Sequence, residues 1–86
     1  MTDAPLTDRD RAMLALEAAW PRHSGFKEEA IRTALGMSPA RYYQLLGRLI
    51  ETEAALEQDP LLVRRLRRLR DARTDQRTAR MRGFAG

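Results

Sequence analysis

The segment of residues 31–50 constrains the fold of this chain more than any other, because it contains a helix end and a helix start side by side. Gly36 can supply the positive φ with which helices commonly end. Ser38 can accept a hydrogen bond from a free backbone N–H, and Pro39 suits the first helical turn, which needs no donor there. We therefore predict two short helices joined by a tight turn, the layout of a helix-turn-helix.

The second of these helices, expected over residues 39–50, separates an apolar from a polar face. The apolar residues recur at helical spacing and should pack inward: Tyr42, Leu45, Leu46 and Leu49. The residues expected toward solvent are Ala40, Arg41, Gln44, Gly47 and Arg48. Gly47 costs roughly 1 kcal/mol relative to Ala in mid-helix, and both a close approach to a groove and a plain local weakness would explain it.

Size and composition exclude several classes of protein. The chain has 86 residues, of which 33% are charged, so it can form one small domain with a modest core. It has no Cys, and its single histidine, His23, is expected to be an ordinary surface residue. The sequence also contains no nucleophile paired with a base and no phosphate-cradling glycine loop. We expect no enzymatic activity, no cofactor and no metal.

No membrane contact is expected. No apolar run approaches the roughly 20 residues of a membrane span, and the first five residues, M-T-D-A-P, do not resemble a signal peptide. We expect a soluble, cytoplasmic protein that associates with the nucleoid.

The positive charge is concentrated at one end of the chain. Residues 1–59 contain seven Lys or Arg and ten Asp or Glu, a net charge of −3, whereas residues 60–86 contain nine Arg and two Asp, a net charge of +7. Lys and Arg that neutralise phosphates release counterions, so this asymmetry favours contact with nucleic acid or another polyanion. A solvated charged helix is the alternative.

The expected first helix begins after an N-cap at Thr7, whose spacing to Asp10 resembles a capping box, and runs to about Ala19. Its core face should carry Met13, Leu16 and Trp20. Its solvated residues should include Arg9, Arg11 and Glu17. Leu14 lies off the core face, so another element, such as the C-terminal helix, is expected to cover it.

The next helix should run from Phe26 or Lys27 to Leu35. Its buried stripe should consist of Ala30, Ile31, Ala34 and Leu35. A short helical link with a cap at Thr52 should follow within residues 51–58.

Asp59 and Pro60 repeat the pattern of a helix start, and a leucine seam follows at Leu62, Leu66 and Leu69. Beyond residue 73 the apolar positions disappear, so residues 74–86 are expected to be frayed or disordered. The predicted architecture is all-α. Residues 1–59 form a trihelical helix-turn-helix core with a short N-terminal tail, and residues 60–86 form a basic Leu/Arg helix with a flexible tail.

Two segments carry a family resemblance, M-S-P-A-R-Y-Y-Q-L-L-G-R-L-I and A-L-E-Q-D-P-L-L-V-R-R-L-R-R-L-R. They closely resemble a family of small actinobacterial proteins known only as a domain of unknown function. The likeness begins at L-T-D-R-D-R-A, continues through K-E-E-A-I-R and reaches the basic tail, so it covers nearly the whole chain. The resemblance implies a helix-turn-helix fold and DNA binding without an assigned target.

The residues themselves favour a DNA-binding protein of the transcriptional regulator class, with double-stranded DNA as its partner. Arg and Gln side chains can read guanine and adenine edges, so the helix of residues 39–50 would enter the major groove through Arg41, Gln44 and Arg48. Phosphate or edge contacts would come from Ser38 and Tyr43. The arginines expected on phosphates are Arg64, Arg65, Arg67, Arg68 and Arg70.

A protein-interaction module is the alternative function. The acidic N-terminal part and the Leu/Arg helix would also suit a protein that binds RNA polymerase, a sigma factor or another regulator, since a fold does not determine a function. The leucine seam should pack on the chain's own core, and a homodimer seam is the second option.

Overall fold

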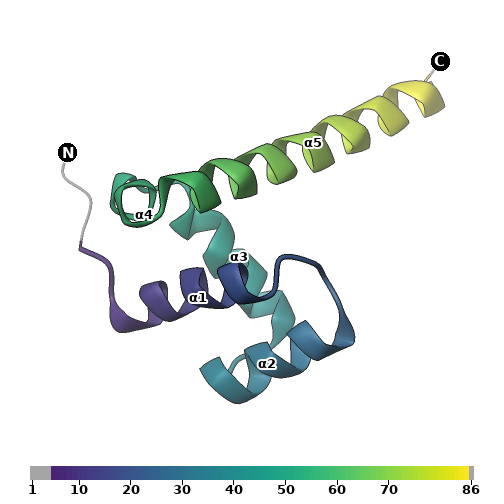
Figure 1. Cartoon of the computed structure of the whole chain (residues 1–86). Helices are drawn as coiled ribbons and strands as arrows, with labels where there is room; N and C mark the ends of the chain where they lie inside the picture. Colours follow the sequence, from purple (N-terminus) through teal and green to yellow (C-terminus); the bar gives the residue numbers. More distant parts are fainter. Residues whose placement is uncertain (1–4, 86) are drawn as a thin grey trace.

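The computed structural model of the chain describes residues 5–85, with the side chains of residues 5–81. It consists of helices, with no strand in this part of the chain (Figure 1). The helices are α1 (Asp8–Ala19), α2 (Gly25–Leu35), α3 (Pro39–Leu49), α4 (Glu53–Gln58) and α5 (Pro60–Ala85). The all-α prediction is confirmed. None of the described helices is both long enough and apolar enough to cross a membrane.

The helix boundaries follow from local capping. In the capping box before α1, Thr7 Oγ1 accepts a hydrogen bond from the Asp10 N–H, and Asp10 Oδ2 accepts one from the Thr7 N–H, each at 3.0 Å. Ser24 caps α2, which therefore begins at Gly25, slightly earlier than predicted. Gly36 ends α2 with a φ of 63°. The predicted starts and ends of α1 to α4 are thus confirmed within about one or two residues.

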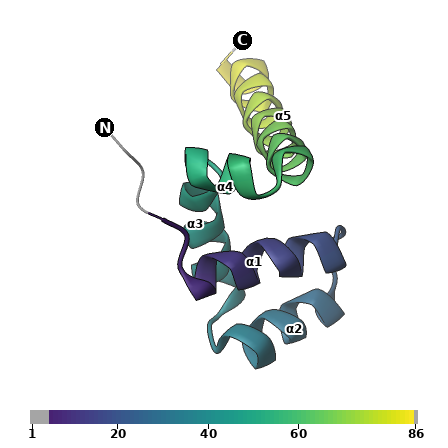
Figure 2. The ribbon, with the colours of Figure 1, turned by 60° about the vertical axis from the view of Figure 1, so that its left-hand side comes forward.

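Helices α1 and α2 lie side by side in opposite directions, and α3 crosses them steeply (Figure 1). Figure 2 shows the same arrangement from another side, with α4 at the end of α3 and α5 leading away from it. Helix α5 contacts α4 and α1 near its start, and its C-terminal half extends past the other helices. The fold is therefore a small core of crossed helices with one long helical projection.

One apolar core connects all five helices. The buried apolar residues are Met13, Leu14, Leu16, Ile31, Tyr42, Leu46, Leu49, Ile50, Ala55, Leu62 and Val63. The predicted inner face of α3 is confirmed for Tyr42, Leu46 and Leu49, while Leu45 is half-buried and packs at the margin. Since Leu62 and Val63 belong to this cluster, the first turns of α5 are part of the core.

Three burial predictions for α1 and α2 were wrong. Trp20 is 38% exposed, because α1 ends at Ala19 and the backbone of Trp20, which precedes Pro21, leaves the helical conformation and no longer follows the helical period. Ala34 is exposed, and the stripe of α2 is centred on Ile31 instead. Glu17, expected in solvent, is only 4% exposed.

The prediction that residues 74–86 are frayed or disordered was also wrong for residues 74–85, which continue α5; residue 86 lies outside the described part. That prediction assumed that each helical turn is stable only if an apolar face of that turn packs on another element. A helix already nucleated on the core can be extended by one backbone hydrogen bond per residue, without such a face.

Candidate nucleic-acid interface

The outward face of α3 presents the polar side chains of Arg41, Gln44 and Arg48 to solvent, together with Ala40, as predicted. The helix that carries them is held at both ends. At its start, Ser38 Oγ accepts a hydrogen bond from the Arg41 N–H at 3.2 Å. At its end, the Arg67 Nε of α5 donates to the Ile50 carbonyl at 2.6 Å. The outward side chains therefore stand on a helix that is capped at its start and joined to α5 at its end.

Two buried charged residues, Glu17 and Lys27, support the inner face of α3, and their burial was not predicted from the sequence. Tyr42 is fully buried, and its hydroxyl donates a hydrogen bond to the Glu17 carboxylate of α1. Lys27 of α2 is 1% exposed, and its Nζ lies 2.9 Å from Glu17 Oε2 and 3.0 Å from Oε1. Burial and the hydrogen bond to Glu17 raise the pKa of Tyr42 well above its usual value. This buried triad, Glu17, Lys27 and Tyr42, joins three helices.

A sequence signal for the triad does exist. Glu17 follows the core residue Met13 by four positions, and Lys27 precedes the core residue Ile31 by four. Residues four apart lie on the same helix face, so both charges occupy core positions of amphipathic stripes. Two opposite charges at such positions indicate a buried pair, because a buried charge must be paired.

Tyr43 and Gly47 lie on a third face of α3, turned toward α5 rather than to open solvent. Both are half-buried and line a cleft between α3 and α5. The Lys27 ammonium lies 5.6 Å from the centre of the Tyr43 ring, and burial raises the pKa of the Tyr43 hydroxyl. The prediction that Gly47 belongs to the open face of α3 is therefore corrected.

His23 connects the loop before α2 to α3 and α5. Its Nδ1 lies 2.8 Å from the Tyr43 hydroxyl, and its Nε2 lies 3.2 Å from an Arg73 guanidinium nitrogen. Arginine can only donate, so Nε2 must accept and the proton of the neutral ring must be on Nδ1. Burial, followed by the charges of Lys27 and Arg73, lowers the pKa of His23 and favours this neutral form.

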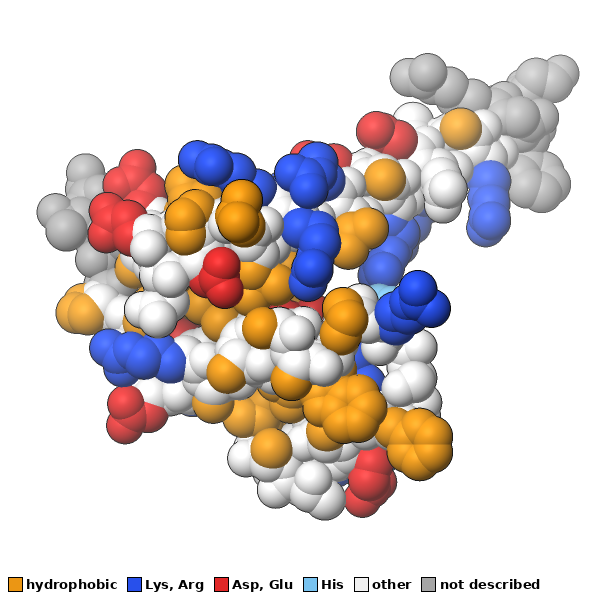
Figure 3. Space-filling model, viewed as in Figure 1, with side chains coloured by type: hydrophobic (Ala, Val, Ile, Leu, Met, Phe, Trp, Pro, Cys, Tyr) orange, Lys and Arg blue, Asp and Glu red, His pale blue; other side chains and the backbone are white. Residues whose placement is uncertain are grey.

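The arginines of α5 divide into two groups. Arg67 and Arg70 are half-buried and fasten α5 to the end of α3, Arg67 through the Ile50 carbonyl and Arg70 through an ion pair with Glu51. Arg70 also pairs with Asp71, its neighbour within α5. The other predicted phosphate ligands join no ion pair among the described residues: Arg64 and Arg68, which are exposed, and Arg65, which is half-buried. Figure 3 shows Lys and Arg side chains spaced along α5. The unpaired group is the one available to a polyanion.

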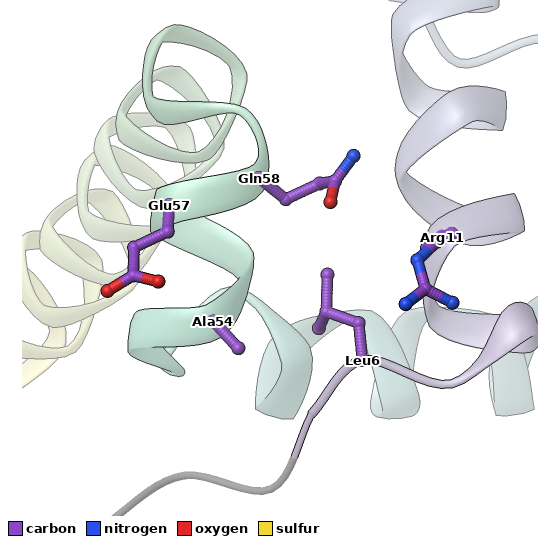
Figure 4. A pocket seen from close by; sticks show the side chains of 5 residues that line it. All are labelled: Leu6, Arg11, Ala54, Glu57 and Gln58. Carbon is purple, nitrogen blue, oxygen red and sulfur yellow. The ribbon is translucent and has the colours of Figure 1, made fainter.

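A second hollow, of about 260 Å³, lies between the segment before α1 and α4. Figure 4 shows Leu6 between the two helices, with Gln58 pointing toward α1 and the Glu57 carboxylate pointing away from it. Its charged groups do not converge on one point. The described residues also include no group of three or more His, Asp or Glu side chains that could hold a metal ion.

Comparisons with known proteins give a family and no assigned function. No curated protein and no solved structure is significantly similar to the chain. A family model does match residues 5–78, and its description reads "Protein of unknown function (DUF3263)". This match covers most of the chain and confirms the resemblance to a domain of unknown function. The chain therefore belongs to the DUF3263 family.

Proposed function

We propose that this protein binds double-stranded DNA and regulates transcription, with α2 and α3 as a helix-turn-helix and α3 in the major groove. The observation that carries the proposal is the exposed polar face of α3, on which Arg41, Gln44 and Arg48 stand in a row. Arginine can pair with the O6 and N7 of guanine, and glutamine can pair with adenine, both through two hydrogen bonds. A helix of this composition is suited to the major groove.

The contacts that hold α3 support this proposal, because side chains can distinguish one DNA base sequence from another only when they are held in a defined position. Tyr42 lies next to Arg41 in the chain and is fixed by the buried triad. Ser38 accepts the Arg41 N–H through its lone pair, so its hydroxyl proton remains available to a phosphate oxygen.

Phosphate contacts in this proposal come mainly from α5. Arg64, Arg65 and Arg68 would supply charge that no ion pair in the described part of the chain neutralises. Arg67 and Arg70 would act indirectly, by holding α5 against the end of α3. Tyr43 would donate its hydroxyl proton to a phosphate from the cleft side, since His23 donates to its oxygen. Such contacts add affinity without sequence preference.

Selection from a random duplex library, followed by fluorescence anisotropy on the enriched sequence, tests the proposal. We expect one enriched motif, and a log Kd that varies linearly with log salt. Arg41→Ala or Gln44→Ala should each weaken binding to that motif by about 5- to 150-fold, the value of one bidentate base contact. Binding to an unrelated duplex should not change.

Arg9→Ala, which removes an exposed arginine from α1, is the matched control and should leave the preference intact. An unchanged preference in the α3 variants would show that α3 is not the reader. Absence of duplex binding at low salt, with co-purification of polymerase subunits, would favour the protein-interaction module instead.

A further inference from the structure

A cleft of about 590 Å³ separates α5 from α3 and from the loop between α1 and α2. Its apolar wall comes from both helices and consists of Leu46, Ile50, Leu66 and Leu69. Leu69 is 51% exposed, although it belongs to the seam with which α5 faces the core. The apolar surface of α5 therefore continues beyond the point at which the core covers it.

The rim of the cleft carries positive charge that no ion pair with a described residue neutralises. Arg22 lies on the loop, and Arg73 and Arg77 lie on α5. None of these three forms an ion pair with another described residue, and Arg73 has only the neutral His23 ring as a partner. The buried charges of Glu17 and Lys27, which also border the cleft, neutralise each other. An apolar wall beside unpaired guanidinium groups is complementary to an anion with an apolar body.

Gly47 is a second, independent observation that points to this cleft. A mid-helix glycine costs roughly 1 kcal/mol relative to alanine. The backbone conformation at residue 47 does not require glycine, because its φ is not positive: among the described residues, positive φ occurs at Gly36. Packing does not require it either, because a Cβ at this position would meet no atom within 4 Å. What the glycine provides is space in the cleft.

We propose that the cleft between α3 and α5 binds a small organic anion, with its apolar body against Leu46, Leu66 and Leu69 and its anionic group at Arg73 and Arg77. A phosphate, sulfonate or carboxylate can accept hydrogen bonds from these guanidinium groups in the bidentate mode. The site does not depend on DNA binding. Because the ligand would contact both α3 and α5, it would stabilise the docked position of α5 by mass action.

The test uses the full chain and 8-anilinonaphthalene-1-sulfonate, a probe with an aromatic body and one anionic group. Isothermal titration calorimetry should give one saturable site, and ¹H–¹⁵N spectra should show shifts concentrated at residues 22–23, 43–50 and 66–77. Arg73→Ala/Arg77→Ala should raise the Kd by at least tenfold, because it removes both ligands of the sulfonate. Arg64→Ala/Arg68→Ala removes the same charge from α5 outside the cleft lining and should leave the Kd within twofold.

Gly47→Leu provides a steric test of the same site. The added side chain has room at its Cβ and projects into the cleft, so the melting temperature should not fall while probe binding is lost. Unsaturable binding in the parent protein would overturn the proposal. Equal weakening by the two double arginine variants, or a Gly47→Leu protein that folds and binds the probe as the parent does, would also overturn it.

Discussion

In the core formed by α1, α2 and α3, Glu17 and Lys27 are removed from water and bind each other, whereas the arginines of α5 lie along a helix that leaves the core. The pair in the core meets Tyr42 and joins three helices. In α5, Arg67 and Arg70 dock the helix at the end of α3 and Arg73 contacts His23, whereas Arg64, Arg65 and Arg68 join no ion pair with another described residue. The buried charges thus organise the core, whereas the unpaired arginine charges of α5 are available for binding.

The largest effect should come from breaking the buried pair. Lys27→Met leaves Glu17 as an unpaired buried charge, so the free energy of unfolding should fall by about 3–5 kcal/mol in urea denaturation. Glu17→Gln/Lys27→Met removes both charges and keeps an acceptor for the Tyr42 hydroxyl, and it should recover most of this loss. Glu28→Ala, an exposed neighbour, is the control and should stay within about 0.5 kcal/mol of the parent. A Lys27→Met protein as stable as the parent would show that the pair does not organise the core.

A smaller effect should separate the docking arginines from the free ones. Arg67→Ala removes the charged hydrogen bond to the Ile50 carbonyl, and the free energy of unfolding should fall by about 1–2 kcal/mol, at the low end for a charged donor because Arg67 is half-buried. Arg68→Ala, next to it and exposed, should change stability by less than about 0.5 kcal/mol. Equal losses in the two variants would mean that the division of the α5 arginines is wrong.

Gly47→Ala should change stability in the opposite direction. The added methyl group meets no atom within 4 Å, so the gain in helix propensity should raise the free energy of unfolding by up to about 1 kcal/mol. Thermal and urea unfolding would both measure this. A loss of stability would show that the cleft closes on Gly47 in solution.

The smallest effect concerns pH and the contact between the two regions at His23. The pKa of His23 is lowered in the folded protein by burial and by Lys27 and Arg73, although Glu17 and Glu28 oppose the shift. The unfolded state then binds more protons, so this contribution to stability is present above pH ~6.5 and decreases as pH falls through the lowered pKa. Protonation of Nε2 would also break the hydrogen bond from Arg73.

Unfolding measured between pH 7.5 and 5.5 should therefore show a small decline that His23→Gln reduces. Glutamine keeps both an acceptor and a donor without titrating in this range. The same slope in both proteins would show that the His23 contact with α5 does not persist in solution.

Sequence alone determined the features that depend on neighbours within about four residues. The N-caps at Thr7, Ser38 and Thr52 and the glycine turn at Gly36 are local, and they predicted the boundaries of α1 to α4 well. Helical spacing also predicted most of the inner face of α3 and its exposed polar residues. These features follow from the geometry of a single helix.

Only the tertiary structure decided which polar residues are buried and which face α5. The decisive contacts join residues far apart in sequence: Lys27 with Glu17, Tyr42 with Glu17, Arg67 with Ile50 and Arg73 with His23. Whether a charge is solvated depends on what another helix places beside it, and the periodicity of one helix contains no such information. For the same reason, helical spacing alone predicts Gly47 on the open face of α3, whereas the position of α5 makes it part of a cleft lining.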